Sequence, residues 1–102
     1  MTTSDATPDV AEAEARMRHW IEEVLVDVPD DLRELEIETG VYQIIPITYT
    51  IPGDRQALFG RVMNKMIDDG HLFRRINGRV GITSAGRAHL LRTRRAVSAS
   101  IA

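Results

Sequence analysis

The sequence predicts an α+β fold that is mainly helical, with one two-stranded hairpin and an additional extended segment. Three observations support this prediction. Apolar residues recur every three or four positions over 7–28 and over 54–69, which is typical of helices with one buried face. The pair Asn77-Gly78 stands between two short runs that contain apolar residues, which indicates a hairpin turn. Residues 41–51 are β-branched and aromatic, which favours an extended, largely buried segment.

The length and composition indicate one globular domain. The chain has 102 residues, of which 43% are hydrophobic and 27% are charged, and this length allows a single modest core. We expect residues 1–6 to form a disordered tail, residues 7–98 the domain and residues 99–102 a flexible C-terminus. No apolar run approaches a membrane span, the N-terminus lacks the features of a signal peptide, and there is no cysteine. These absences predict a cytoplasmic protein without membrane association or disulfides.

The formal net charge of −2 hides a division between the two halves of the chain. Residues 1–40 hold twelve of the fifteen acidic residues, and residues 53–102 hold ten of the thirteen basic ones. Residues 41–52 carry no charge. Such an asymmetry indicates a side of the protein that faces a polyanion, either nucleic acid or a membrane surface. The alternative is scattered, solvated charge that cancels in three dimensions.

The first predicted helix has clear boundaries. Thr7 can cap it, Pro8 suits the first helical position, and Pro29 ends it. The face opposite the apolar one is mainly acidic and includes Glu22, and Val26 also lies on this outer face. The predicted buried face consists of Val10, Ala13, Met17, Trp20, Ile21, Val24, Leu25 and Val28.

Residues 30–39 fit two descriptions, and residues 41–51 fit one. Residues 30–39 form a short helix ended by Gly40, or else a half-buried strand, because Leu35 and Ile37 alternate with glutamates. We predict that residues 41–51 are extended, and Pro46 then places them at a sheet edge or splits them into two segments.

The second strongly predicted helix begins after Asp54, which can cap it, and ends at Gly70, whose lack of a side chain permits a left-handed C-cap. Its predicted buried face consists of Leu58, Phe59, Val62, Met63, Met66 and Ile67. Its outer face consists of Ala57, Gly60, Arg61, Asn64 and Asp68, with Lys65 at the edge.

The hairpin follows this helix. A two-residue type I′ turn at Asn77-Gly78 pairs Phe73 with Ile82 and Arg75 with Val80. The side chains of Arg74, Ile76 and Arg79 then point to the other face. Thr83 or Ser84 caps a third helix, in which Leu90, Leu91 and Val97 pack while Arg92 and Arg95 face outward.

This order of elements resembles the C-terminal two-thirds of a winged helix-turn-helix domain. The matching segments are Gly70-His71-Leu72 after the helix, residues 73–82 as a basic hairpin, and Ile82-Thr83-Ser84-Ala85-Gly86-Arg87 at the start of the last helix. The resemblance covers about residues 54–95, and a looser one is to the winged N-terminal module of some restriction enzymes. It implies a recognition helix over 54–69 and a wing over 73–82. The family's second helix then lies in 30–39, or in an irregular form within 44–53.

The basic residues of these elements suit duplex DNA. Arg61 and Asn64 match the hydrogen-bonding edges of guanine and adenine in the major groove. A hairpin cannot bury three unpaired guanidinium groups, so we expect its arginines to be in solvent, where they can meet phosphate or the minor groove. The alternative is a charged hairpin that only protects a sheet edge. The candidate DNA-binding residues are Arg61, Asn64, Lys65, Arg74, Arg75, Arg79, Arg92 and Arg95.

Catalytic and metal-binding patterns are absent from the sequence. His19, His71 and His89 are far apart and lack the spacing of metal ligands, so we expect surface or packing histidines. Gly60 inside a helix suggests close approach to a groove floor, or close packing on another helix. No phosphate loop, dinucleotide-binding turn or nucleophile elbow occurs. The sequence therefore predicts a non-enzymatic protein without cofactor or metal.

The expected function is sequence-specific binding of duplex DNA by a small transcriptional regulator. We expect a homodimer through the N-terminal half, because Val26 faces outward and residues 41–51 offer a free strand edge. The first alternative is a winged-helix adaptor that binds a protein partner. A weaker alternative is a DNA-mimicking inhibitor, which would use the acidic first half.

Overall fold

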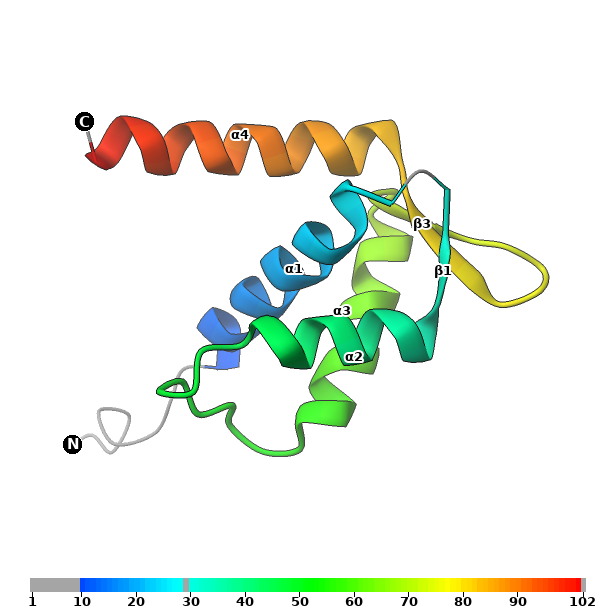
Figure 1. Ribbon diagram of the computed structural model, residues 1–102, viewed down its shortest axis with the longest axis horizontal. Coiled ribbons are helices and arrows are strands. Elements are labelled where there is room, and N and C mark those ends of the chain that lie inside the picture. Colours follow the sequence, from blue (N-terminus) through cyan, green and yellow to red (C-terminus); the bar gives the residue numbers. More distant parts are fainter. Residues whose placement is uncertain (1–9, 29, 102) are drawn as a thin grey trace.

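The fold is α+β, as predicted. The computed structural model describes residues 10–28 and 30–101, without the side chains of residues 95–101. This described part holds four helices and a three-stranded antiparallel sheet with the strand order β1-β3-β2. Figure 1 shows the β2–β3 hairpin projecting from the helical body and α4 running away from it. The elements are α1 (Val10–Val26), β1 (Leu32–Arg33), α2 (Glu34–Ile44), α3 (Arg55–Asp68), β2 (Leu72–Arg74), β3 (Arg79–Ile82) and α4 (Ser84–Ile101).

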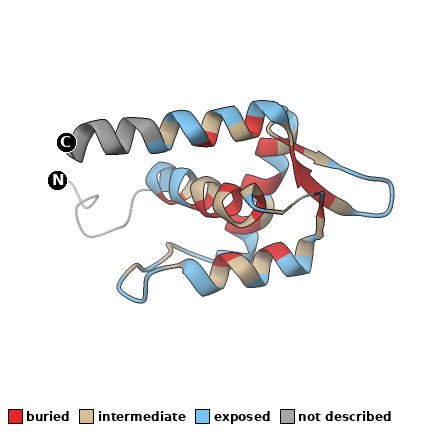
Figure 2. Cartoon of the chain, turned by 45° about the horizontal axis from the view of Figure 1, so that its top comes forward, coloured by how far each residue is buried: buried red, intermediate tan, exposed pale blue. Residues whose placement is uncertain are grey.

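The core lies where α1, α2 and α3 meet the sheet (Figure 2). The predicted α3 face is buried except for Ile67, which is partly buried, and most of the predicted α1 face is buried as well, whereas Val10 is exposed. Thr7, Pro8 and Pro29 lie outside the described residues. The placement of Glu22 on an outer acidic face is wrong, because α4 packs against that side of α1 and buries the carboxylate. The buried apolar residues of these helices are Ala13, Met17, Trp20, Ile21, Leu25, Ile37, Val41, Leu58, Phe59, Val62, Met63 and Met66.

The prediction of an extended segment over 41–51 is wrong. Residues 34–44 form the single helix α2, and residues 45–54 form an irregular connection without a strand. Ile37 and Val41 lie one turn apart and are both buried, so packing against α1 outweighs the strand preference of the β-branched residues. A Cβ at Gly40 would lie 3.2 Å from Cγ1 of Val24, so glycine lets the two helices approach closely. The extended conformation of Ile45, which precedes a proline, ends the helix.

The hairpin register differs from the prediction by one residue. Phe73 pairs with Gly81, and the amide of Arg75 donates to the carbonyl of Arg79 (2.8 Å). The turn therefore has three residues, 76–78, and among them only Gly78 has positive φ (86°). A Cβ at Gly81 would collide with the Phe73 ring, so this glycine makes room for the ring. As a consequence, the side chains of Arg75 and Arg79 share one face of the hairpin.

The strand considered for residues 30–39 depended on Leu35 and Ile37, which lie in α2, whereas the strand β1 has only two residues and gives no periodic pattern. Leu32 pairs with Val80 and Arg33 with Arg79, which places the start of β1 beside the hairpin. The neighbouring Asp31 consequently lies next to the face that holds the two arginines. This placement decides the electrostatics of the hairpin.

The end of α3 and the start of α4 are joined by direct contacts. Gly70, which follows the C-cap residue Asp69, has φ of 80°, so the left-handed glycine predicted at the end of α3 is confirmed. The Thr83 hydroxyl donates to the carbonyl of Gly70 (2.6 Å) and accepts from the amide of Gly86 (3.0 Å), so Thr83 begins α4. A Cβ at Gly86 would collide with the backbone of His71. The Thr-x-x-Gly pattern therefore fixes α4 against the α3–β2 turn.

Of the apolar residues predicted to pack in α4, one is confirmed and one is not. Leu90 is buried as predicted, whereas Leu91 is exposed, and the side chain of Val97 lies outside the described residues. In the described part of the chain, none of the helices combines the length and apolar character needed to cross a bilayer.

Candidate nucleic-acid interface

The outer face of α3 is exposed as predicted. Asp54 caps the helix by accepting from the amides of Gln56 (2.9 Å) and Ala57 (3.4 Å). Arg61 and Asn64 are both exposed on the outer face. A Cβ at position 60 would meet nothing within 4 Å, so the glycine there does not serve helix packing in the described structure. This face thus combines small residues with two side chains suited to base edges.

Two cations of α3 share one carboxylate. Glu14 of α1 accepts from Arg61 Nε (2.8 Å) at one oxygen and from Lys65 Nζ (2.8 Å) at the other. These two hydrogen bonds hold the pKa of the Glu14 carboxyl below its usual value. The pairing fixes Nε of Arg61 and leaves its terminal Nη groups free to donate. The edge of α3 therefore carries one net positive charge from these three groups.

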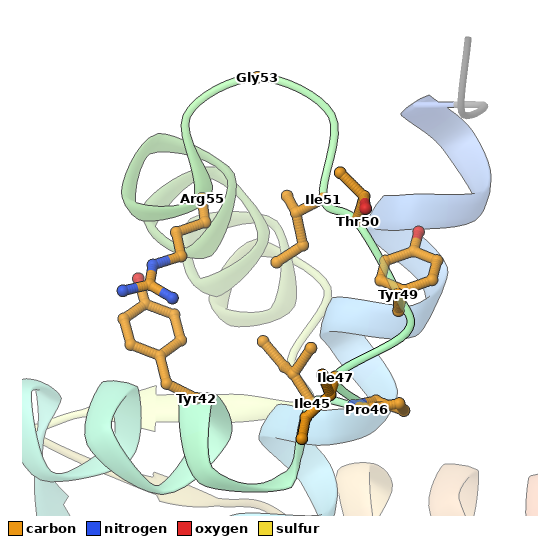
Figure 3. A pocket seen from close by; sticks show the side chains of 9 residues that line it. All are labelled: Tyr42, Ile45, Pro46, Ile47, Tyr49, Thr50, Ile51, Gly53 and Arg55. Atoms are coloured by element: carbon orange, nitrogen blue, oxygen red, sulfur yellow. The ribbon is translucent and has the colours of Figure 1, made fainter. Parts of the chain in front are cut away.

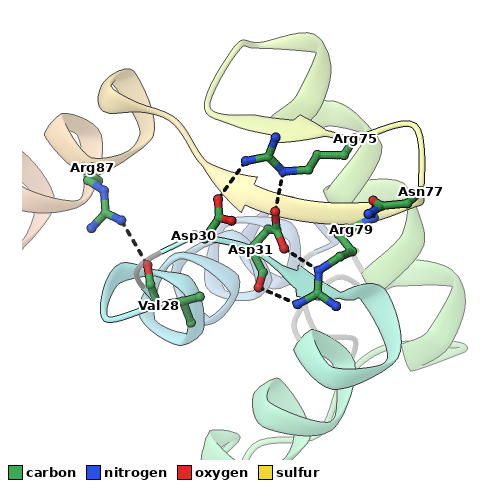
Figure 4. Close-up of polar contacts among 7 residues, drawn as sticks. All are labelled: Val28, Asp30, Asp31, Arg75, Asn77, Arg79 and Arg87. Atoms are coloured by element: carbon green, nitrogen blue, oxygen red, sulfur yellow. Dashed lines mark hydrogen bonds and ion pairs between the residues drawn. The ribbon is translucent and has the colours of Figure 1, made fainter.

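The hairpin arginines have partners, contrary to the prediction that they are unpaired in solvent (Figure 4). Nε of Arg75 and Nε of Arg79 each donate to a different oxygen of Asp31. Arg75 Nη2 also donates to Asp30 (2.7 Å), and Arg79 Nη2 donates to the carbonyl of Asp31 (3.1 Å). On the other face, Nη2 of Arg74 lies 3.4 Å from Oε1 of Glu34.

Asp31 is the centre of this cluster. Only 6% of its side chain is exposed, against 47% for Arg75 and 35% for Arg79. The hydrogen bonds from the two arginines lower the pKa of Asp31, and Asp31 in turn raises the pKa of both guanidinium groups. Each arginine keeps an outward Nη group, because Nε and the other Nη point at the acids. The cluster therefore orients two partly exposed cations.

A shallow hollow of about 330 Å³ lies beside the turn and is lined by Arg33, Asn77, Gly78 and Arg79. Arg33 is exposed and, among the described residues, has no acidic partner within ion-pair distance. It was not singled out from the sequence, because only the pairing of β1 with β3 places it next to Arg79. At the tip of the turn, the Ile76 side chain is fully exposed.

The structure does not bring the last two predicted residues to this surface. Arg92 is exposed on α4, which leaves the sheet in the direction away from the hairpin tip (Figure 1). The side chain of Arg95 lies outside the described residues. Arg94, which was not predicted, donates to Glu23 of α1 and ties α4 to that helix. The candidate interface is therefore formed by α3, the hairpin and Arg33.

The connection between α2 and α3 runs beside the first turn of α3. It encloses a pocket of about 410 Å³ into which Ile45 and Ile51 point (Figure 3). The guanidinium of Arg55 lies 4.2 Å from the centre of the Tyr42 ring, and Tyr49 packs edge-on against the α1 tryptophan. Burial and a hydrogen bond to Glu38 (2.7 Å) raise the pKa of Tyr42 to about 12.

The prediction of scattered histidines is wrong for two of the three. The rings of His71 and His89 are 4.9 Å apart, and His89 Nδ1 lies 2.8 Å from a carboxylate oxygen of Glu22. Burial, followed by the charge of Arg18, lowers the pKa of His71. These residues are distant in sequence and meet because α4 and the turn between α3 and β2 both lie against α1. His19 is separate and pairs with Glu23.

Comparison with protein-family models, curated proteins and solved structures found no match for this chain.

Proposed function

We propose that the chain is a winged helix-turn-helix protein that binds duplex DNA sequence-specifically and acts as a small transcriptional regulator. The observation that supports this best is the element order, α1-β1-α2-α3-β2-β3-α4, with the sheet order β1-β3-β2. It sets the exposed face of α3 directly before a protruding hairpin rich in arginine. In the proposed complex, α3 enters the major groove and the hairpin lies on phosphate or in the minor groove.

The dimensions and residues of α3 fit this role. Its 14 residues form a helix whose outer face is exposed and carries small residues at positions 57 and 60, which allows the backbone to approach a groove floor. Asn64 can donate to and accept from adenine, and Arg61 can donate two hydrogen bonds to guanine. Glu14 already holds Nε of Arg61, so its two Nη groups are presented as a pair. Such orientation lowers the entropy cost of forming the base contact.

The ion pairs of the hairpin change the expected electrostatics. Arg74, Arg75 and Arg79 face three carboxylates, so this region carries little net charge. The outward Nη groups still donate to phosphate oxygens, but fewer counterions are released than by three unpaired arginines. We therefore propose that the hairpin positions the protein on the duplex, and that the sequence preference comes from α3.

A protein-binding adaptor is the alternative, and one observation favours it. Leu35 and Ile44 of α2 and Ile47 of the following connection are exposed. Such apolar side chains are typical of surfaces that bind proteins. The DNA-mimicking inhibitor receives less support, because Glu14, Asp31 and other acidic groups of the first half are paired with cations.

The homodimer remains a prediction with a changed basis. Residues 45–54 contain no strand, so the free edge expected there does not exist. Val26 is only partly exposed, and its carbonyl accepts from Arg87 (2.6 Å). A dimer through the N-terminal half would instead use the exposed surface of α2.

The test is selection of bound fragments from a random duplex library, followed by affinity measurements on a selected and a scrambled duplex. The proposal predicts enrichment of one motif, preferential binding of the selected duplex and weaker binding as salt rises. Weak binding of every duplex at low salt would favour the adaptor. Strong binding without an enriched motif would contradict the role of α3.

A further inference from the structure

Three potential metal ligands from distant parts of the chain converge beside α1. Glu22 comes from α1, His71 from the α3–β2 turn and His89 from α4. Each offers one ligand atom, and these atoms all lie within 4.8 Å of one another. In a tetrahedral zinc site with bonds of about 2.0–2.1 Å, neighbouring ligand atoms are about 3.4 Å apart. Small side-chain rotations would therefore bring the three groups to a metal.

The chemistry of these three ligands suits a divalent cation of intermediate softness, such as Zn²⁺. Two imidazoles and one carboxylate are a common ligand set for zinc, and they leave a fourth position for water. Glu22 is 1% exposed, and one of its carboxylate oxygens lies 2.8 Å from Nδ1 of His89. Burying a carboxylate is costly, and a bound cation would compensate that cost.

The cluster is accessible from solvent. A pocket of about 270 Å³ reaches it and is lined by Ala15, Arg18, His19, Glu22, His89 and Thr93. This pocket gives an ion a path to the ligands and gives a fourth, non-protein ligand a place. His19 lines the same pocket but is not one of the converging groups.

In the described structure, the cation beside the cluster is the guanidinium of Arg18. One Nη contacts His71 Nδ1, and the other donates to Asp69 (2.9 Å). Its Nε is buried and has no hydrogen-bond partner. Asp69 is exposed, so the guanidinium can turn outward and keep this partner when a metal approaches. Arg18 thus competes with a metal for His71.

We propose that Glu22, His71 and His89 form a binding site for a divalent metal ion of the zinc type. The ion would link α1, α4 and the turn between α3 and the hairpin. This site lies apart from the proposed DNA-contacting residues and does not depend on the proposed function.

The test uses the full-length, tag-free protein and Co²⁺ as a spectroscopic probe, followed by displacement with Zn²⁺. One tetrahedral Co²⁺ per chain should give visible d–d absorption that Zn²⁺ abolishes. The variants His71→Gln, His89→Gln and Glu22→Gln should each weaken binding about tenfold or more. His19→Gln is the matched control and should retain binding. Arg18→Gln should bind more tightly, because it removes the competing charge.

Two further measurements keep the test independent of folding defects. Circular dichroism without metal identifies any variant that fails to fold, and X-ray absorption of the Zn²⁺-loaded wild type reports the ligands directly. Two imidazoles in that spectrum would support the site. Absence of Co²⁺ and Zn²⁺ binding to the wild type would overturn the proposal. So would undiminished binding by folded His71→Gln and His89→Gln.

Discussion

Replacing Asp31 by asparagine separates the two effects of the hairpin ion pairs. The side chain keeps its size, but Arg75 and Arg79 lose their shared carboxylate. The three arginines of the hairpin then face two acidic groups, Asp30 and Glu34, so the local charge rises by one. We expect tighter binding to random duplex DNA at low salt and a lower free energy of unfolding.

The magnitude of the DNA effect follows from counterion release. One additional unpaired cation steepens the slope of log affinity against log salt by about 0.9, which adds a roughly threefold loss for a fourfold rise in salt. Fluorescence anisotropy with a labelled random duplex at several salt concentrations measures this slope. Asp27→Asn, which removes an exposed acid just after α1, is the control for a general change in net charge.

The stability effect has a defined pH dependence. The arginines lower the pKa of Asp31 in the folded protein, so its contribution is present above the ordinary aspartate pKa of about 3.9. That contribution is lost as the pH falls through the lowered pKa that Asp31 has in the folded protein. The difference in unfolding free energy between wild type and Asp31→Asn should therefore shrink in acid. Urea denaturation over a pH series tests this, and an equal difference at every pH, together with an unchanged salt slope, would refute the ion-pair cluster.

Three other predictions concern packing, ionisation and assembly. Gly86→Ala should lower the free energy of unfolding by about 1–3 kcal/mol, because its Cβ collides with the His71 backbone, whereas Gly60→Ala in open space should raise it by about 0.5–1 kcal/mol. Urea denaturation measures both, and equal effects would contradict the packing at Gly86. Ultraviolet titration should show Tyr42 ionising near its raised pKa of about 12, and Tyr42→Phe should remove that step; a single step near the ordinary tyrosine value would contradict its burial. Sedimentation should show a homodimer at concentrations on the order of tens of micromolar, with and without duplex DNA, and a monomer in both cases would overturn this prediction.

The elements that could be predicted from the sequence are those with strong local signals. Apolar spacing locates α1 and α3, Asp54 and Gly70 mark the ends of α3, and the Asn-Gly pair locates the hairpin. The outward position of Arg61 and Asn64 follows from helical periodicity alone. These predictions succeed because each depends on residues within a few positions of one another.

Most of the failures involve contacts that no local pattern shows. Strand preference suggested extended structure at 41–51, but Gly40 and Val41 pack against α1 and hold the segment in a helix as far as Ile44. The hairpin register depends on the Phe73 ring lying over Gly81. The partners of the hairpin arginines are forty or more residues away, so no local pattern reveals them. The same holds for the histidine cluster.

The central claim is that α3 contacts bases and thereby gives sequence preference. Arg61→Ala should cost about 1–3 kcal/mol of binding free energy on the selected duplex and much less on a scrambled one, because only the correct base edge is lost. Arg79→Ala is the comparison and should lower the affinity for both duplexes by a similar factor. Because Glu14 keeps Lys65 as a partner and Arg61 is exposed, thermal stability should change little. The decisive measurement is the ratio of the two affinities for Arg61→Ala: a ratio reduced about fivefold or more supports the claim, and the wild-type ratio would contradict it.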